Sequence, residues 1–188
     1  EKHRTVAQVD AYLDGVGPDS LAALQYTGGT TGVSKGAMLS HGNLVANTLQ
    51  LLQMNGEYIT PGKETALTAL PLYHIFAFTV NLLGFYHVGA RNILIPNPRP
   101  PSNLKRAFEN YKITWTTGVN TLFNALLNER WFAESPPKHL KASAAGGMAL
   151  HESVANKWRE VTGTPIVEGY GLTESSPVLS FNPLGGMF

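Results

Sequence analysis

The sequence predicts an α/β fold with a mainly parallel sheet and helices on both faces. Short apolar segments alternate with longer amphipathic segments along the 188 residues, and few hairpin signals separate them. Strands that alternate with helices need crossover connections, which are typical of parallel sheets. Hydrophobic residues make up 43% of the chain. The length and this apolar content suit one ordinary domain with a sizeable core.

The first half of the chain is expected to hold three strands and two helices. Ser40 is a suitable N-cap, and the apolar residues after it, including Leu44 and Leu52, fall on one helical face. Pro71 closes the second strand, and a proline-rich loop follows the third. In chain order, the expected elements are a strand over 21–26, a helix over 41–54, a strand over 65–70, a buried helix over 75–88 and a strand over 91–95.

The second half continues the alternation of helix and strand. Ser102 is the expected cap of its first helix, and Phe123 and Leu126 mark the apolar face of its second. In chain order, the expected elements are a helix over 102–111, a strand over 113–117, a helix over 119–129, a strand over 140–145, a helix over 151–161 and a strand over 165–168.

Composition disfavours several classes of function. The net charge is only +1, so no electrostatic attraction to nucleic acid is expected. Cysteine is absent, which excludes disulfides and thiolate metal sites and fits a reducing cytoplasm. The most apolar window, 75–88, is shorter than a membrane span. Charged residues make up 14% of the chain, against roughly 25% in an average soluble domain. We therefore expect part of its surface to be covered in a longer protein.

The most informative motif is YTGGTTGVSKG, Tyr26 to Gly36, with four glycines, three threonines, one serine and one lysine. Glycines let backbone N–H groups approach a ligand, and hydroxyls with one ammonium group supply donors suited to a polyphosphate. Lys35 is not followed by Ser or Thr, as the common NTPase loop requires. A flexible surface loop is the alternative interpretation.

Three further motifs follow predicted strands or lie in apolar runs. In EGYGLTE, Glu168 to Glu174, a tyrosine between glycines can face a planar base and a glutamate can hold Mg²⁺. AAGGMAL, Ala144 to Leu150, allows close approach of a flat ligand. LPLYHIFAF, Leu70 to Phe78, places a histidine in an apolar run. The alternatives are a solvated glutamate after a turn, a glycine turn before a helix, and a histidine packed in the core.

In this order, the four segments resemble the signature segments of the adenylate-forming enzymes, the superfamily of acyl-CoA synthetases, peptide-synthetase adenylation domains and luciferases. The sequence between them is most similar to bacterial long-chain fatty-acid CoA ligases. Ser34 departs from the family pattern, which usually has proline before the lysine. The resemblance implies that residues 1–188 are a central fragment of the large N-terminal AMP-binding domain, with the C-terminal domain absent.

The resemblance also implies a role for each matching residue. The first motif would hold the β- and γ-phosphates of ATP, Tyr170 and the Gly-Gly turn would enclose adenine, and His74 would orient the attacking carboxylate. Apolar residues of the 75–88 helix would line an acyl tunnel with Phe78 as its gate, although a core helix has the same pattern. The implied residues are, for catalysis, Lys35, His74, Thr173 and Glu174; for ATP, Thr27, Gly28, Gly29, Thr30, Thr31, Gly32, Lys35, Gly146, Gly147, Met148, Glu168, Gly169, Tyr170, Gly171 and Thr173; for the acyl tunnel, Phe76 and Phe78; and for the metal, Glu174.

The implied activity is ATP-dependent conversion of a long-chain fatty acid to acyl-CoA. The carboxylate would attack the α-phosphorus of ATP to give acyl-adenylate and pyrophosphate, and the CoA thiol would then displace AMP. ATP, Mg²⁺ and CoA, the last as a substrate, are the implied cofactors. The resemblance implies a cytoplasmic enzyme and leaves open peripheral association with the inner membrane and a homodimer of the full-length protein.

Two alternatives to a fatty-acid ligase remain at this point. One is an adenylating enzyme for another carboxylic acid, and the other is a non-catalytic nucleotide-binding module. In the family, a later aspartate motif binds ribose and a lysine on the C-terminal domain assists adenylation. Neither motif occurs before Phe188. The isolated 188-residue chain is therefore expected to be inactive.

Overall fold

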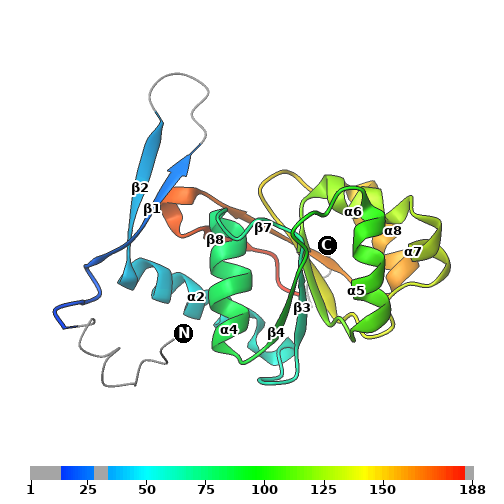
Figure 1. Ribbon diagram of the computed structural model, residues 1–188, viewed down its shortest axis with the longest axis horizontal. Coiled ribbons are helices and arrows are strands. Elements are labelled where there is room, and N and C mark those ends of the chain that lie inside the picture. The colour runs from blue at the N-terminus through cyan, green and yellow to red at the C-terminus, as the bar shows by residue number, and fades with distance from the viewer. Residues whose placement is uncertain (1–13, 28–33, 185–188) are drawn as a thin grey trace, which may run out of the picture.

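A computed structural model describes residues 14–27 and 34–184 and has a six-stranded sheet at its centre (Figure 1). The strand order is β4-β3-β5-β6-β7-β8, and all neighbouring pairs are parallel except β7 and β8. The expected mainly parallel α/β fold is thus confirmed. The strands are β3 (Thr65–Thr68), β4 (Arg91–Leu94), β5 (Trp115–Gly118), β6 (Ala142–Ala145), β7 (Ile166–Gly171) and β8 (Val178–Phe181).

The first strand does not belong to this sheet. β1 (Leu21–Thr27) pairs antiparallel with β2 (Lys35–Ser40) in a separate two-stranded ribbon, which projects from the body in Figure 1. Residues 21–26 therefore form a strand as expected, but this strand takes no part in the parallel sheet. β2 was not predicted from the sequence. In its short run KGAMLS, Ala37 is half-buried and Leu39 is buried, and these are its only apolar residues that are not exposed.

Helices cover both faces of the sheet, as expected. Adjacent strand residues point to opposite faces, so Ala66 packs beneath α2 and the 75–88 segment, whereas Leu67 packs beneath α5 to α8. The helices of the larger core are α5 (Lys105–Asn110), α6 (Asn120–Leu127), α7 (Arg130–Glu134) and α8 (Glu152–Thr162). Trp158 at its centre is fully buried and meets Phe123 edge to face, with ring centroids 4.9 Å apart.

The opposite face is covered by α2 (His41–Asn55) and by one continuous helical segment. That segment consists of α3 (Ile75–Ala77), the π-helix η2 (Phe78–Gly84) and α4 (Phe85–His87). The expected buried helix over 75–88 is therefore present, but its middle is π-helical. π-Helical stretches are rare in proteins, and those that occur often lie at functional sites. Among the described residues, no helix has the length and apolarity needed to cross a bilayer.

Of the two helix caps predicted from serines, Ser40 is confirmed and Ser102 is wrong. The Ser40 hydroxyl accepts from the Asn43 N–H, and the Asn43 side chain accepts from the Ser40 N–H, each at 3.2 Å. This capping box fixes the start of α2. Ser102 is not a cap, because it lies inside the 3₁₀ turn η3 (Pro101–Leu104), which begins on proline and precedes α5.

An ion pair between the buried Glu64 and the exposed Lys141 lies at the amino edge of the sheet. The Glu64 side chain, which precedes β3, is fully buried, and its Oε1 lies 2.5 Å from Lys141 Nζ and accepts from the Thr60 N–H at 2.7 Å. Burial alone would raise the pKa of Glu64, but hydrogen bonds from Lys141, Thr114 and Thr60 outweigh it and lower the pKa below its ordinary value.

Candidate functional site

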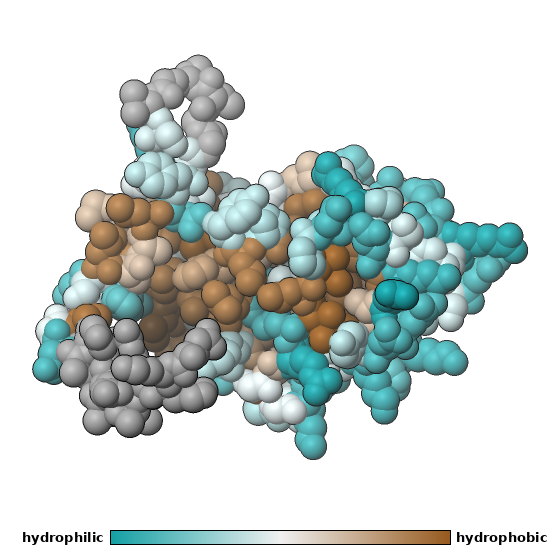
Figure 2. Space-filling view, in the orientation of Figure 1, coloured by the Kyte–Doolittle hydropathy of each residue, from teal (hydrophilic) through white to brown (hydrophobic). Residues whose placement is uncertain are grey.

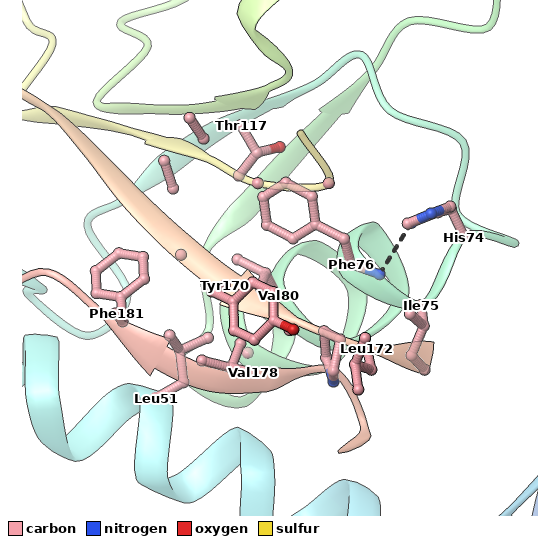
Figure 3. A pocket seen from close by; sticks show the side chains of 18 of the residues that line it. Leu51, His74, Ile75, Phe76, Val80, Thr117, Tyr170, Leu172, Val178 and Phe181 are labelled. Carbon is pink, nitrogen blue, oxygen red and sulfur yellow. Dashed lines mark hydrogen bonds between the residues drawn. The ribbon is translucent and has the colours of Figure 1, made fainter. Parts of the chain in front are cut away.

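A cavity of about 390 Å³ opens at the carboxyl ends of the central strands. Ligands of open α/β sheets bind at this edge, because the loops that follow the strands meet there. The last residues of β5, β6 and β7 line the cavity together with α2 and the 75–88 segment. Figure 3 shows the side chains of Phe76, Tyr170 and Phe181 around it, and Figure 2 shows apolar side chains gathered on this part of the surface.

Gly146 and Gly147 form one wall of the cavity directly after β6. A Cβ added to Gly146 would lie 3.2 Å from the Phe76 ring and 3.4 Å from the Gly169 carbonyl oxygen, so a side chain would crowd this wall. Gly147 has a φ of +79°, which L side chains rarely adopt. These two positions give the cavity a flat backbone surface, which suits a planar ligand.

The end of β7 and the short turn η4 (Thr173–Ser175) line the cavity beside this wall. The sequence predicted that β7 ends at residue 168, but Gly169 to Gly171 continue the strand and pair with β8. Tyr170 is 62% exposed, so its ring is available to a ligand. Thr173 and Glu174 also line the cavity, and the Glu174 side chain is exposed.

The ribbon of β1 and β2 approaches the same cavity. Thr27, the last residue of β1, lines it and pairs in register with Lys35, the first residue of β2. β2 also contacts η4, but Lys35 itself is exposed and is not among the residues that line the cavity. The predicted phosphate-binding residues Gly28, Gly29, Thr30, Thr31 and Gly32 lie outside the described residues.

His74 lines the cavity from the N-cap position of α3. Its Nδ1 accepts a hydrogen bond from the Phe76 N–H at 3.2 Å, drawn as a dashed line in Figure 3. The neutral ring therefore carries its proton on Nε2, which is free to donate to a ligand. The side chain is exposed, so the alternative of a histidine packed in the core was wrong.

The interior of the cavity is apolar. Leu51, Phe76, Val80, Phe85 and Phe181 line it, on the face of the sheet that α2 and the 75–88 segment cover. A chamber of this kind can hold an extended hydrocarbon group through the hydrophobic effect.

Several predicted residues lie elsewhere. Phe78 packs on the cluster of Leu39, Leu44 and Ile75 and is not among the cavity-lining residues. Met148 and Glu168 are also absent from the lining, and Glu168 Oε1 accepts from the Leu150 N–H at 2.8 Å, which ties β7 to the loop after Gly147.

Sequence reasoning missed the lining residues on α2 and β8, such as Leu51, Asn55, Val178 and Phe181. No local motif marks them, because apolar residues of a core and of a cavity have the same helical or strand periodicity.

The arrangement suits a magnesium nucleotide. Mg²⁺ in phosphate-binding sites usually takes only one or two carboxylates, with substrate phosphates and water as further ligands. Glu174 forms no ion pair with any other described residue, and no group of three acidic or histidine side chains gathers in the described part of the chain. A single free carboxylate beside a glycine wall fits this mode of binding.

A family model for AMP-binding enzymes matches residues 2–186. The chain belongs to the AMP-binding enzyme family. Curated relatives in this family include the long-chain-fatty-acid–CoA ligase of Escherichia coli O157:H7, 52% identical over 166 residues, which are 88% of this chain and 30% of the relative. The ligase of the same name from Haemophilus influenzae is 48% identical over 187 residues, 96% of this chain and 33% of the relative. The chain thus spans about a third of these AMP-binding relatives.

Solved structures of AMP-binding enzymes share the fold. Apo MatB from Rhodopseudomonas palustris superposes with a TM-score of 0.80 at 32% identity, over 92% of this chain and 33% of that one. O-succinylbenzoate Coenzyme A synthetase from Bacillus subtilis in complex with AMP gives a TM-score of 0.76 at 26% identity, over 89% and 33%.

Proposed function

We propose that the full-length protein activates a long-chain fatty acid with ATP and transfers the acyl group to CoA. The observation that carries the proposal is one cavity in which the Gly146–Gly147 wall, Tyr170 and Glu174 stand at the opening of an apolar chamber. Relatives that are about half identical in sequence are named long-chain-fatty-acid–CoA ligases, which supports a fatty acid as the substrate.

In this proposal the glycine wall and Tyr170 hold the adenine ring between them. Gly146 and Gly147 line the cavity without side chains, and the exposed Tyr170 ring supplies an aromatic face. Thr173 donates to the α-phosphate, while Lys35, Thr27 and the glycine-rich segment of residues 28–32 hold the β- and γ-phosphates.

Glu174 would hold Mg²⁺, which neutralises the phosphate charge when it is bound. The attack of the fatty carboxylate on the α-phosphorus needs no covalent bond to the protein. Transfer at phosphorus depends mainly on the positions of the reactants and on electrostatic stabilisation. The exposed Glu174 carboxylate, free of ion pairs to the described residues, is available for this role.

His74 would orient the fatty carboxylate. Because its Nδ1 accepts from the Phe76 N–H, its Nε2–H can donate to one carboxylate oxygen and leave the other for attack on phosphorus. The hydrocarbon chain would then lie on Phe76 and Val80 inside the chamber. A gating role for Phe78 stays a prediction, since its ring packs on a neighbouring cluster.

Residues 1–188 would form part of the large N-terminal AMP-binding domain of a cytoplasmic ligase, which uses ATP, Mg²⁺ and CoA. The exposed apolar residues of the β1–β2 ribbon and α2, such as Leu24, Met38 and Leu49, support contact with further parts of the same protein. Nucleic acid is not an expected partner, because the net charge of +1 gives no attraction to it.

The substitution Glu174→Gln in the full-length protein tests the proposal. ATP–pyrophosphate exchange with a long-chain fatty acid should fall at least about a hundredfold, since a key electrostatic contact to the transferring centre is lost. Glu160→Gln is the matched control, because Glu160 is exposed on α8 and, among the described residues, pairs only with Lys157. Unchanged exchange in Glu174→Gln would refute the proposal, and preference for a short or aromatic acid in a substrate panel would refute the fatty-acid part alone.

A further inference from the structure

We infer that Thr79 and Asn47 are positioning residues that hold the turn bearing Glu174 at the mouth of the cavity. The inference rests on the proposed role of Glu174 in binding Mg²⁺. It concerns two buried side chains that lie in neither the glycine motif nor the EGYGLTE motif, and that come from different helical segments.

The Glu174 side chain makes no hydrogen bond or ion pair with the described residues. Its carboxylate is therefore placed by the backbone of its turn. That turn is a closed unit, because the Leu172 N–H donates to the Pro177 carbonyl at 3.0 Å and the Ser175 N–H to the Leu172 carbonyl at 3.1 Å. Whatever holds this unit from outside also sets the position of the carboxylate.

Thr79 holds the turn from the π-helix. Its side chain is fully buried, and its Oγ1 donates to the Ser176 carbonyl oxygen at 2.9 Å. Ser176 is itself buried and has a φ of +75°, which non-glycine residues seldom adopt. A hydroxyl bond to this residue fixes the turn at its most constrained position, two residues after Glu174.

Asn47 holds the following strand from α2. Its Nδ2 donates to the Val178 carbonyl at 2.8 Å, and its Oδ1 accepts from the Val178 N–H at 3.1 Å. The side chain is 6% exposed, so water competes little for these two bonds. The turn is thus held on both sides of Pro177, by a hydroxyl before it and an amide after it.

Asn81 ties the π-helix to the sheet and so gives Thr79 a fixed base. Asn81 Nδ2 donates to Thr68 Oγ1 at 2.8 Å, and Thr117 Oγ1 donates to Asn81 Oδ1 at 2.9 Å. Thr68 and Thr117 are paired neighbours on β3 and β5, and Thr117 lines the cavity. The position of Glu174 is thereby coupled to the strand ends that form the cavity floor.

The test uses the full-length protein and the dissociation constant of ATP, measured by isothermal titration with Mg²⁺ and with EDTA. Thr79→Val keeps the shape of the side chain but leaves the Ser176 carbonyl without its donor. We expect ATP binding to weaken about tenfold with Mg²⁺, the lower end of the range for partners that orient metal ligands, and to change little with EDTA. Thr79→Ser restores the hydroxyl and should bind like the native protein.

Two further variants make the outcome decisive. Asn47→Leu should show the same Mg²⁺-dependent loss, which covers the case in which Thr79→Val does not fold. Thr162→Val is the matched control, because it removes a threonine hydroxyl that donates to the Trp158 carbonyl at 2.8 Å in α8; it should bind ATP normally under both conditions.

The failures of the two proposals differ. Equal weakening with Mg²⁺ and with EDTA, or no change in either Thr79→Val or Asn47→Leu, would overturn the positioning role while Glu174→Gln still loses Mg²⁺-dependent binding. If Glu174→Gln itself binds ATP normally in Mg²⁺, the proposed function fails first and the inference fails with it.

Discussion

The two edges of the parallel sheet differ in how their polar groups are used. At the amino edge, Glu64 is buried and its Oε1 is held by Lys141 and the Thr60 N–H. At the carboxyl edge, Glu174 and Tyr170 are exposed, and glycines replace side chains beside an apolar cavity. Both edges carry a carboxylate, yet only the second leaves it available to a ligand.

Under the proposed function, the amino edge stabilises the fold and the carboxyl edge binds the nucleotide. A buried group such as Glu64 is not accessible to a ligand, whereas exposed groups on a shaped wall can exchange water for ligand contacts. Substitutions at the two edges should therefore separate effects on turnover from effects on stability.

After Glu174→Gln, the largest loss of turnover is expected from Gly171→Ala in the full-length protein. A Cβ at this position would lie 2.1 Å from the Pro177 carbonyl oxygen, so the turn bearing Glu174 must move. A displacement of about 1 Å at a reacting centre can cost about a hundredfold in rate, and we expect a loss of that size in ATP–pyrophosphate exchange. Gly56→Ala is the control, since nothing lies within 4 Å of its added Cβ. Native exchange in Gly171→Ala would show that the carboxyl edge tolerates displacement.

A smaller loss is expected from His74→Ala. Removing the Nε2–H takes away one hydrogen bond to a charged carboxylate, and the apolar chamber still binds the hydrocarbon tail. We expect about a tenfold fall in kcat with the KM for the fatty acid nearly unchanged. Steady-state kinetics on a long-chain acid measures both quantities. His87→Ala, an exposed histidine of α4 outside the cavity lining, should match the native protein, and a similar loss in both variants would contradict the role of His74.

Glu64→Gln should leave turnover unchanged and lower stability. It removes a buried carboxylate that accepts from Lys141 and from the Thr60 N–H, at a cost of about 2 kcal/mol for bonds involving a charged group. Thermal unfolding at pH 7 measures this cost, and Glu134→Gln, an exposed residue of α7 paired with Arg130, is the control. A loss of activity without a loss of stability would reverse the assignment of the two edges.

The pH dependence of this cost has a defined sign. The pKa of Glu64 is lowered in the folded protein, so its contribution is fully present above the unfolded value of about 4.3 and is lost as the pH falls through the folded pKa. The stability difference between the native protein and Glu64→Gln should shrink below about pH 4.3. A difference that grows on acidification would contradict the role of the ion pair.

The sequence predicted those features that depend on short stretches of chain. The N-cap at Ser40 and the glycine turn at Gly146 and Gly147 are each defined by a few consecutive residues. The β1–β2 ribbon was missed, because strand pairing across the glycine-rich segment leaves no periodic signal within either short strand.

Long-range contacts explain the remaining omissions. Thr79 bonds a residue 97 positions away, and Asn47 bonds one 131 positions away. In the sequence both are polar residues within helices, where nothing distinguishes a side chain that holds a distant turn from one that faces water. Phe78 and Phe76 are similarly alike in sequence, although only Phe76 lines the cavity.

The most direct test of the account is a crystal structure of the full-length protein with ATP, Mg²⁺ and a long-chain fatty acid analogue that does not react. The account predicts adenine between Gly146–Gly147 and Tyr170, the metal on Glu174 and the hydrocarbon chain against Phe76 and Val80. A nucleotide bound at the amino edge near Glu64, or a metal with no contact to Glu174, would contradict it.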